Sequence, residues 1–391
     1  ACRCAAAPYE CELETDSCRL SSLKGPYSLV YPPADATSCI FDSSTPYRFQ
    51  VFPGARDKLL FYFQGGGACW SPASLKGGLC STDASPVDEE GVFSSSPDNP
   101  YASYTKVVVL YCSGDLHSGN VVRNDWSGPE GGPVTQTGAN NTRSVLQWVK
   151  RQQATGQLKA TLTDLALMGC SAGSLGVGVW SHHVLGALSW SAASVTLDSY
   201  LGVLPPGIPG ELMVEFDACS IFQEQLQPRC HDETLTMPEI VAEAMTTFRS
   251  VPFAYLQSKA DEVQIAYYNT LVILGIGHGP LDTALVTPSS FLTMASSILY
   301  GLSNSQPNMV AYLVNSNQHC YTPYTYWFTA DASGPQGNGT GVAMLDWAGA
   351  LPLHEGDSIT TECEGEPKSM PRWRGKDYCA KELLGKTFTE P

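Results

Sequence analysis

Positively charged residues are scarce in this sequence. Among 391 residues, Lys and Arg number 22 whereas Asp and Glu number 38, so the formal net charge is −16, and the basic residues form no cluster. Nucleic acids and anionic membrane surfaces attract proteins through positive charge. We therefore expect neither of them as a partner.

Long apolar runs are also missing. A membrane-spanning helix needs about 18 or more consecutive apolar residues, and the longest candidate, Leu271 to Ile276, is far shorter. We therefore expect no membrane span. Charged residues make up only 15% of the chain, whereas apolar residues make up 43% and aromatic residues 10%. Because disordered chains are usually highly charged and poor in aromatics, the sequence predicts a folded protein with a large core.

The cysteines do not have the paired spacing of a zinc site. There are 14 of them, scattered along the chain. An even number of scattered cysteines favours an oxidised, secreted protein over a cytosolic protein with buried free thiols. Two pairs bracket short loops and are predicted to form disulfides, Cys69 with Cys80 and Cys219 with Cys230.

Two further features favour a secreted, extracellular protein. Asn140 and Asn338 each begin an Asn-x-Ser/Thr sequon for glycosylation. The chain begins with Ala-Cys-Arg-Cys rather than with Met and an apolar segment. We interpret this start as that of a mature chain from which a signal peptide has been removed.

Short and nearly continuous apolar runs recur along the chain, which is typical of parallel strands that are covered on both faces. Helical patterns lie between them, for example over 142–153 and over 240–248 after a capping box at Thr236. This alternation predicts an α/β fold with a mostly parallel open sheet flanked by helices. Residues 47–52 alternate instead, which predicts an antiparallel edge strand with one wet face. The predicted buried strands are 58–63, 106–111, 164–168, 195–197, 253–256 and 309–314.

The segment Gly169-Cys-Ser-Ala-Gly173 lies between a predicted strand and a helical stretch over 174–188. A serine in such a sharp turn is held above the sheet, and the glycines on either side leave room for it. The next N–H, that of Ala172, then points at the substrate oxygen. The motif therefore indicates a nucleophile at Ser171, with a glycine-rich start of a helix as the alternative.

A second glycine-rich segment follows the predicted strand 58–63. Gly65, Gly66 and Gly67 stand in succession there, and in α/β hydrolases such a loop supplies a further N–H to the oxyanion hole. The alternatives are a flexible turn and a phosphate-binding nest, but no Gly-Lys-Ser/Thr of a P-loop follows.

An activated serine needs a base, and the base needs an orienting acid. His319 comes shortly after the last predicted buried strand, where hydrolases carry the base, whereas His182 and His183 lie within the helical stretch and are expected to pack or to face solvent. Asp198 and Asp261 both follow strands, and Asp261 lies between Ser171 and His319 in the hydrolase order. Order alone leaves other late Asp and His residues open.

Five segments, in this order, resemble the pectin acetylesterase family, which also holds the Notum carboxylesterases. They are Gly65-Gly-Gly-Ala-Cys69 with Trp70, Tyr111-Cys-Ser-Gly114 with Ser118-Gly119, Gly169-Cys-Ser-Ala-Gly173, Ser258-Lys-Ala-Asp-Glu-Val-Gln264, and Asn315-Ser-Asn-Gln-His-Cys320. The resemblance covers about residues 58 to 320. We predict a single α/β-hydrolase domain over 1–391, with 1–50 and about 330–391 as peripheral, disulfide-rich extensions.

The resemblance implies Ser171 as nucleophile, Asp261 as orienting acid and His319 as base. It also implies that the oxyanion hole is formed by the N–H groups of three residues, Gly66, Gly67 and Ala172. Asp198 resembles a segment of the family that follows a strand, and we assign it a structural role.

These observations predict a secreted serine carboxylesterase that removes acyl groups, acetyl first among them, from an extracellular carbohydrate or a similar ester. The mechanism needs no metal and no organic cofactor. A net charge of −16 opposes close association with polyanionic pectate. The alternatives are a Notum-like deacylase of a lipidated protein and a catalytically silent extracellular glycoprotein with the same fold.

Overall fold

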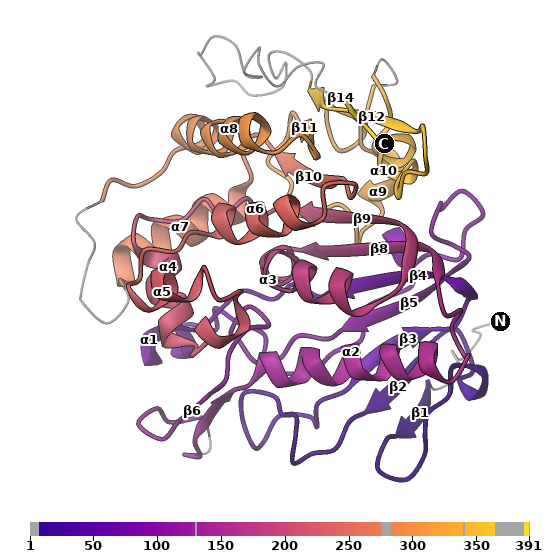
Figure 1. Cartoon of the computed structure of the whole chain (residues 1–391). Coiled ribbons are helices and arrows are strands. Elements are labelled where there is room, and N and C mark those ends of the chain that lie inside the picture. Colours follow the sequence, from indigo (N-terminus) through magenta and orange to yellow (C-terminus); the bar gives the residue numbers. More distant parts are fainter. Residues whose placement is uncertain (1–7, 130, 276–282, 339–340, 364–386, 391) are drawn as a thin grey trace, which may run out of the picture.

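A computed structural model describes residues 8–129, 131–275, 283–338, 341–363 and 387–390 of the chain. Within these residues, ten strands form one sheet in the order β1-β2-β3-β5-β4-β8-β9-β10-β11-β13 (Figure 1). Their bounds are β1 Tyr9–Glu12, β2 Ser28–Tyr31, β3 Phe49–Phe52, β4 Ala55–Phe63, β5 Tyr104–Val109, β8 Leu162–Cys170, β9 Trp190–Asp198, β10 Phe253–Ser258, β11 Met309–Val314 and β13 Glu362–Cys363. Two small antiparallel ribbons complete the strands, β6 Val121–Arg123 with β7 Val134–Gln136, and β12 Ser358–Thr360 with β14 Thr387–Thr389.

The sheet is mostly parallel. From β5 through β4, β8, β9, β10 and β11 to β13, every neighbouring pair runs in the same direction. All residues of β5, β10 and β11 are buried, as the short apolar runs of the sequence predict. The predicted α/β fold with a mostly parallel sheet is therefore confirmed.

Helices cover the sheet, and Figure 1 shows α2, α3 and α6 in front of it. The predicted capping box at Thr236 is present at the start of α6, where Glu239 completes it. The helices are α1 Pro72–Lys76, α2 Gly138–Ala154, α3 Ala172–Ala187, α4 Ile208–Glu215, α5 Gln227–His231, α6 Met237–Thr247, α7 Glu262–Leu274, α8 Pro288–Ser305, α9 Tyr326–Thr329 and α10 Met344–Gly349, with short 3₁₀ turns η1 Leu20–Ser22, η2 Gly91–Phe93 and η3 Cys219–Ile221. Among the described helices, none combines the length and the apolar character that crossing a membrane requires.

The prediction of an edge strand over 47–52 is wrong. Strand β3 is antiparallel, but it lies between β2 and β5, and all four of its residues are buried. The polar Gln50, which alternation places on the wet face, is covered by a loop. Its side chain bonds both backbone groups of Val87, at 3.0 and 2.8 Å. A polar residue in an alternating pattern therefore faces loop backbone here, not water.

Both predicted disulfides are confirmed, Cys69–Cys80 and Cys219–Cys230. The structure adds three further pairs, Cys11–Cys18, Cys39–Cys112 and Cys170–Cys320. Cys363 is also disulfide-bonded, and Cys2, Cys4 and Cys379 lie outside the described residues.

Candidate active site

Ser171 lies in the turn between β8 and α3, with φ 60° and ψ −126°. Such a backbone conformation is rare and costly for a residue other than glycine, and it is typical of the nucleophile of α/β hydrolases. The two flanking glycines allow this turn. A Cβ on Gly169 would lie 2.3 Å from the carbonyl oxygen of Gly173, and a Cβ on Gly173 would lie 2.0 Å from that of Phe63. Larger residues would therefore force the turn open.

The glycine-rich loop after β4 lies against Ser171. A Cβ on Gly65 would lie 3.0 Å from the Ser171 Cβ. The loop can therefore lie this close to the serine only because residue 65 has no side chain. Gly66 and Gly67 have φ values of 153° and 69°. Neither of their N–H groups donates in the backbone hydrogen bonds of the described loops. The N–H of Ala172 is the first of α3 and has no acceptor within the helix. None of the three predicted oxyanion donors therefore has a backbone acceptor among the described residues.

Two buried side chains fix this loop from behind. His117 Nε2 donates to the carbonyl oxygen of Gln64 at 2.8 Å, and the Tyr111 hydroxyl donates to that of Gly67 at 2.9 Å. Burial lowers the pKa of His117 to about 4, so the ring is neutral and Nε2 carries the proton that it donates. The sequence places His117 only in a loop after a strand, and its hydrogen bond to the glycine-rich loop was not predicted.

Asp261 and His319 form a pair. Asp261 is fully buried at the start of α7, where its Oδ1 accepts from the N–H groups of Val263 and Gln264 at 3.1 and 2.9 Å. His319 Nδ1 lies 2.8 Å from Asp261 Oδ2 and 3.0 Å from Oδ1. Because the carboxylate also caps the helix, its orientation toward the imidazole is fixed by α7.

The other nitrogen of His319, Nε2, is buried and has no hydrogen-bond partner among the described residues. It makes no hydrogen bond to Ser171, but both residues line one cleft. Catalytic hydrogen bonds are often long in a free enzyme and tighten when substrate binds. The structure therefore brings together Ser171, His319 and Asp261, with an unoccupied acceptor on His319.

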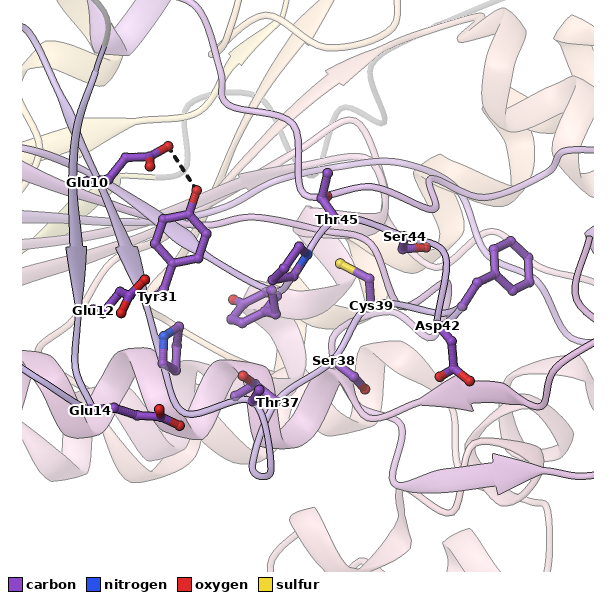
Figure 2. A pocket seen from close by; sticks show the side chains of 15 residues that line it. Glu10, Glu12, Glu14, Tyr31, Thr37, Ser38, Cys39, Asp42, Ser44 and Thr45 are labelled. Carbon is purple, nitrogen blue, oxygen red and sulfur yellow. Dashed lines mark hydrogen bonds between the residues drawn. The ribbon is translucent and has the colours of Figure 1, made fainter. Parts of the chain in front are cut away.

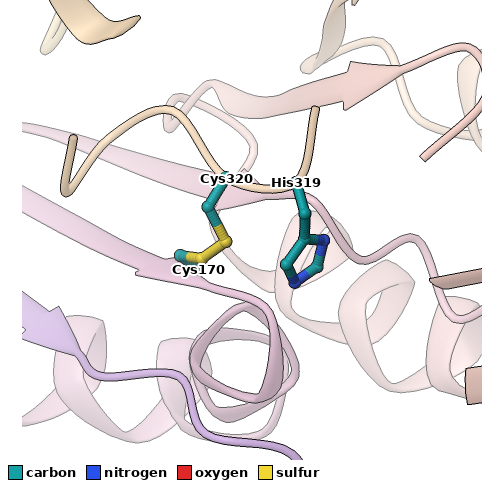
Figure 3. Close-up of side chains that lie close together, drawn as sticks. All are labelled: Cys170, His319 and Cys320. Atoms are coloured by element: carbon teal, nitrogen blue, oxygen red, sulfur yellow. A yellow bond between two sulfur atoms is a disulfide. The ribbon is translucent and has the colours of Figure 1, made fainter. Parts of the chain in front are cut away.

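A disulfide lies directly beside this group (Figure 3). It joins Cys170, the residue before Ser171, to Cys320, the residue after His319. The two sulfurs and a ring nitrogen of His319 lie within 4.8 Å of one another. Zinc and related metals bind thiolate, not disulfide sulfur. This cluster is therefore a crosslink between two segments of the site, not a set of metal ligands.

Two cavities meet at Ser171. The outer cleft, of about 420 Å³, also holds His319 and two exposed acids, Asp88 and Glu90. The inner cavity, of about 190 Å³, is mostly apolar. Its lining residues are Gly67, Ala68, Leu79, Leu116, Ser171, Ala172, Leu175, Tyr200, Leu204, Leu212, Val263 and Tyr267. Ser171 thus lies between a larger cleft with two acidic residues in its lining and a smaller, mostly apolar cavity.

A hollow of about 680 Å³, larger than both of these cavities, lies elsewhere. It runs beside β1 and β2, where Glu10, Glu12 and Glu14 line up along the chain (Figure 2). The Tyr31 hydroxyl donates to Glu10 at 3.0 Å. This groove shares no residue with the two cavities at Ser171, so the candidate chemistry lies outside it.

The remaining predicted residues lie apart from this group. His182 and His183 are half-buried on α3, and His183 Nε2 bonds the carbonyl oxygen of Ile221. Asn140 is half-buried in the first turn of α2 and accepts a hydrogen bond from Arg143. Asn338 is exposed; the rest of its sequon lies outside the described residues. Neither sequon is tested as a glycosylation site.

Comparison with known proteins identifies the fold and the family. The fold is similar to that of the Wnt deacylase Notum from Drosophila in two crystal forms, with TM-scores of 0.52 and 0.51, sequence identities of 19% and 18%, and in both cases 78% of this chain and 89% of the other covered. A sequence comparison with curated proteins gives no significant match. The sequence model of the pectinacetylesterase family matches residues 21–356. Since this match spans most of the 391 residues, the chain belongs to the pectinacetylesterase family, which makes it an ester hydrolase with an α/β fold.

Proposed function

We propose that this protein is a secreted serine esterase that removes short acyl groups, acetyl first among them, from an uncharged hydroxyl-bearing compound such as a carbohydrate. One observation carries the proposal: the Asp261–His319 pair opens onto the cleft in which Ser171 meets the glycine loop. The family match supports ester hydrolysis, and the disulfides support an oxidising compartment.

The proposed reaction has two steps. His319 Nε2 takes the proton of Ser171 Oγ as the serine attacks the ester carbonyl, and Asp261 stabilises the imidazolium through Nδ1. The N–H groups of Gly66, Gly67 and Ala172 bind the oxyanion, which is worth about 3–4 kcal/mol for each donor in known cases. His319 then protonates the leaving alcohol, and water releases the acyl group from Ser171 by the same route.

The inner cavity suits a short acyl chain. An apolar cavity of about 150 Å³ holds one benzene molecule, so 190 Å³ takes an acyl group of about six to eight carbons. A chain of 16 carbons is about twice that length and exceeds the space of this cavity. The size of the cavity therefore favours short acyl groups, acetyl among them, over the long acyl chain of a lipidated protein.

We expect kcat/KM for nitrophenyl esters to fall by at least about fivefold from hexanoate to palmitate, because overfilling a packed cavity costs about 1–3 kcal/mol. Leu204→Ala enlarges the cavity and is expected to reduce the difference in kcat/KM between the hexanoate and the palmitate ester. Leu299→Ala is the matched control, since Leu299 is fully buried in α8 and does not line the cavity. Palmitate hydrolysed faster than hexanoate by the wild-type protein would contradict the short-chain assignment.

The outer cleft receives the alcohol in this scheme. Its charged lining residues, apart from His319, are Asp88 and Glu90, with no Lys or Arg among the described residues that line it. The net charge of −16 has the same sign. A polyanionic alcohol such as pectate is therefore repelled both at long range and in the cleft.

We expect acetate release from acetylated polygalacturonate at low salt to be at least about tenfold slower than from its methyl-esterified, uncharged form. The gap should narrow as salt rises from about 0.01 to 0.15 M, because the Debye length falls from about 30 to 8 Å. The variant with Asp88→Asn and Glu90→Gln should also reduce the difference in acetate release between the two polymers, because it removes the two acids from the cleft.

The control for this charge change is the variant with Asp232→Asn and Glu233→Gln. Both residues are exposed and line neither cavity at Ser171, but their replacement alters the net charge equally. If the two double variants behave alike, the effect belongs to the net charge and not to the cleft. A wild-type preference for the charged polymer would contradict the proposed substrate class.

A further inference from the structure

Asp198, the last residue of β9, is fully buried beside the nucleophile. Its backbone carbonyl accepts the N–H of Ser171 at 3.0 Å. This bond ties the sharp turn after β8 to the end of the neighbouring strand. The backbone of Asp198 therefore holds one half of the candidate site.

The side chain of Asp198 holds the other half. Its Oδ2 accepts from the N–H groups of Tyr321 and Thr322 at 2.8 and 2.7 Å, and from the Thr322 hydroxyl at 2.8 Å. Ser199 donates its hydroxyl to Asp198 Oδ1 at 2.8 Å and accepts the N–H of Cys320 at 2.9 Å. Three consecutive N–H groups that follow His319 are thus bound by two adjacent residues.

The segment that carries His319 needs such a support. It runs from the end of β11 at Val314 to the start of α9 at Tyr326 and has no strand or helix of its own. Buried N–H groups outside regular structure must find acceptors elsewhere, and a carboxylate provides strong ones. The disulfide from Cys170 to Cys320 adds a covalent link at the same point (Figure 3).

Burial of this carboxylate is itself unfavourable. Burial raises the pKa of Asp198 above the usual aspartate range, although the hydrogen bonds from Thr322 and Tyr321 oppose the shift. Buried carboxylates are rare unless they are paired or hydrogen-bonded. All of the hydrogen bonds that the Asp198 side chain accepts come from its neighbour Ser199 and from the segment after His319.

We propose that Asp198 is a positioning residue, which fixes His319 relative to Ser171 by binding the backbone that follows His319. This inference rests on the proposed esterase function and deepens it. Asp198 does not line the cleft, so it acts through His319 and not on the substrate. The role goes beyond the purely structural one that the sequence predicts for it.

The test is Asp198→Asn, which replaces one of the two carboxylate oxygens with NH₂. Either the Ser199 hydroxyl or the N–H groups of Tyr321 and Thr322 then lose their acceptor. We expect kcat for nitrophenyl acetate to fall by about 10²-fold, as for a catalytic group displaced by about 1 Å, with KM nearly unchanged. The second readout is independent of activity: the ¹⁵N-coupled proton that His319 Nδ1 shares with Asp261, assigned with His319→Gln, should disappear or shift in the NMR spectrum.

Asp164→Asn is the matched control. Asp164 is also a buried aspartate, bonded to Tyr104 at 2.9 Å and to Lys58 at 2.6 Å. It lies near the start of β8, about 20 Å from the end of that strand at 3.3 Å per residue. We expect it to lower the unfolding temperature but to leave kcat and the His319 resonance intact.

If Asp198→Asn does not fold, Ser199→Ala replaces it. Its expected loss in kcat is smaller, about three- to tenfold, because it removes the two hydrogen bonds of the Ser199 hydroxyl, to Asp198 and from Cys320, but leaves the carboxylate in place. Its control is Ser194→Ala, also on β9, where the buried hydroxyl has no hydrogen-bond partner in the part of the chain that the structure describes. Unchanged kcat and an unchanged His319 resonance in the Asp198 or Ser199 variant would overturn the proposal. An equal loss of kcat in the matched control would overturn it too.

Failure of the proposed esterase function can be distinguished from failure of the positioning role. In that case the wild-type protein itself hydrolyses no ester, and the NMR readout alone decides. A His319 resonance that is lost in Asp198→Asn but kept in Asp164→Asn would still support positioning, whereas a resonance kept in both would refute it.

Discussion

Ser171→Ala is expected to lower kcat for ester hydrolysis by at least about 10⁴-fold. In one serine hydrolase, removal of the catalytic serine lowers kcat by about 10⁶-fold. The reason is that the acyl-enzyme requires an oxygen nucleophile, which alanine does not supply. The turn itself should survive, because Ser171 makes its backbone bond to Asp198 through its N–H. We therefore expect the unfolding temperature to change little.

Ser181→Ala is the control for this variant. Ser181 lies on α3, is fully buried, and donates only to the carbonyl oxygen of Gly178 one turn earlier. It should retain full activity. Rates with nitrophenyl acetate and labelling by a fluorophosphonate, followed by peptide mapping, check both variants.

The label should be found on Ser171 in the wild-type protein and nowhere in the alanine variant. Full activity of Ser171→Ala would remove the nucleophile from the proposed mechanism. A folded wild-type protein that neither hydrolyses esters nor takes up the label would support the catalytically silent alternative instead.

The sequence was sufficient to predict where the candidate site lies in the fold. Strands β4, β8, β10 and β11 are parallel, so the segments after them emerge at one edge of the sheet. Apolar runs locate these strands, and the residues just beyond their ends are the predicted ones. Because local patterns and strand direction together determine this edge, the grouping follows without knowledge of side-chain packing.

What the sequence could not predict depends on contacts between distant segments. Cys170 and Cys320 are separated by 150 residues, and 14 cysteines permit a large number of pairings. The two disulfides that were predicted span 11 residues each. The inner cavity is likewise assembled from residues 67 to 267, and no local pattern indicates that their side chains leave a space.

His117 and Asp198 illustrate the same limit for polar residues. Each is buried, and each bonds backbone that carries a functional group, the glycine loop in one case and the segment after His319 in the other. A sequence pattern does not show which backbone groups will lack a hydrogen-bond partner in a helix or strand. It also does not show which side chain will bond them instead. Only the arrangement of the loops decides whether such a residue is structural or positions the chemistry.

Asp261→Asn is expected to lower kcat by about 10⁴-fold, the loss observed when the acid of a serine protease triad becomes an amide. The carboxylate accepts at Oδ2 from both His319 Nδ1 and the Gln264 side chain. An amide NH₂ in that place donates to Nδ1, which moves the imidazole proton to Nε2. His319 then cannot take the proton of Ser171.

The same substitution should lower the unfolding temperature only modestly, because one hydrogen bond of the buried Gln264 side chain is lost, whereas kcat falls by orders of magnitude. Asn retains an oxygen for the N–H groups of Val263 and Gln264, and Asn and Asp are about equally good at the start of a helix. Glu262→Gln is the control, because it makes the same change of charge one residue later on an exposed side chain. Equal kcat values for the two variants, at equal unfolding temperature, would show that Asp261 serves α7 alone and that His319 works without an orienting acid.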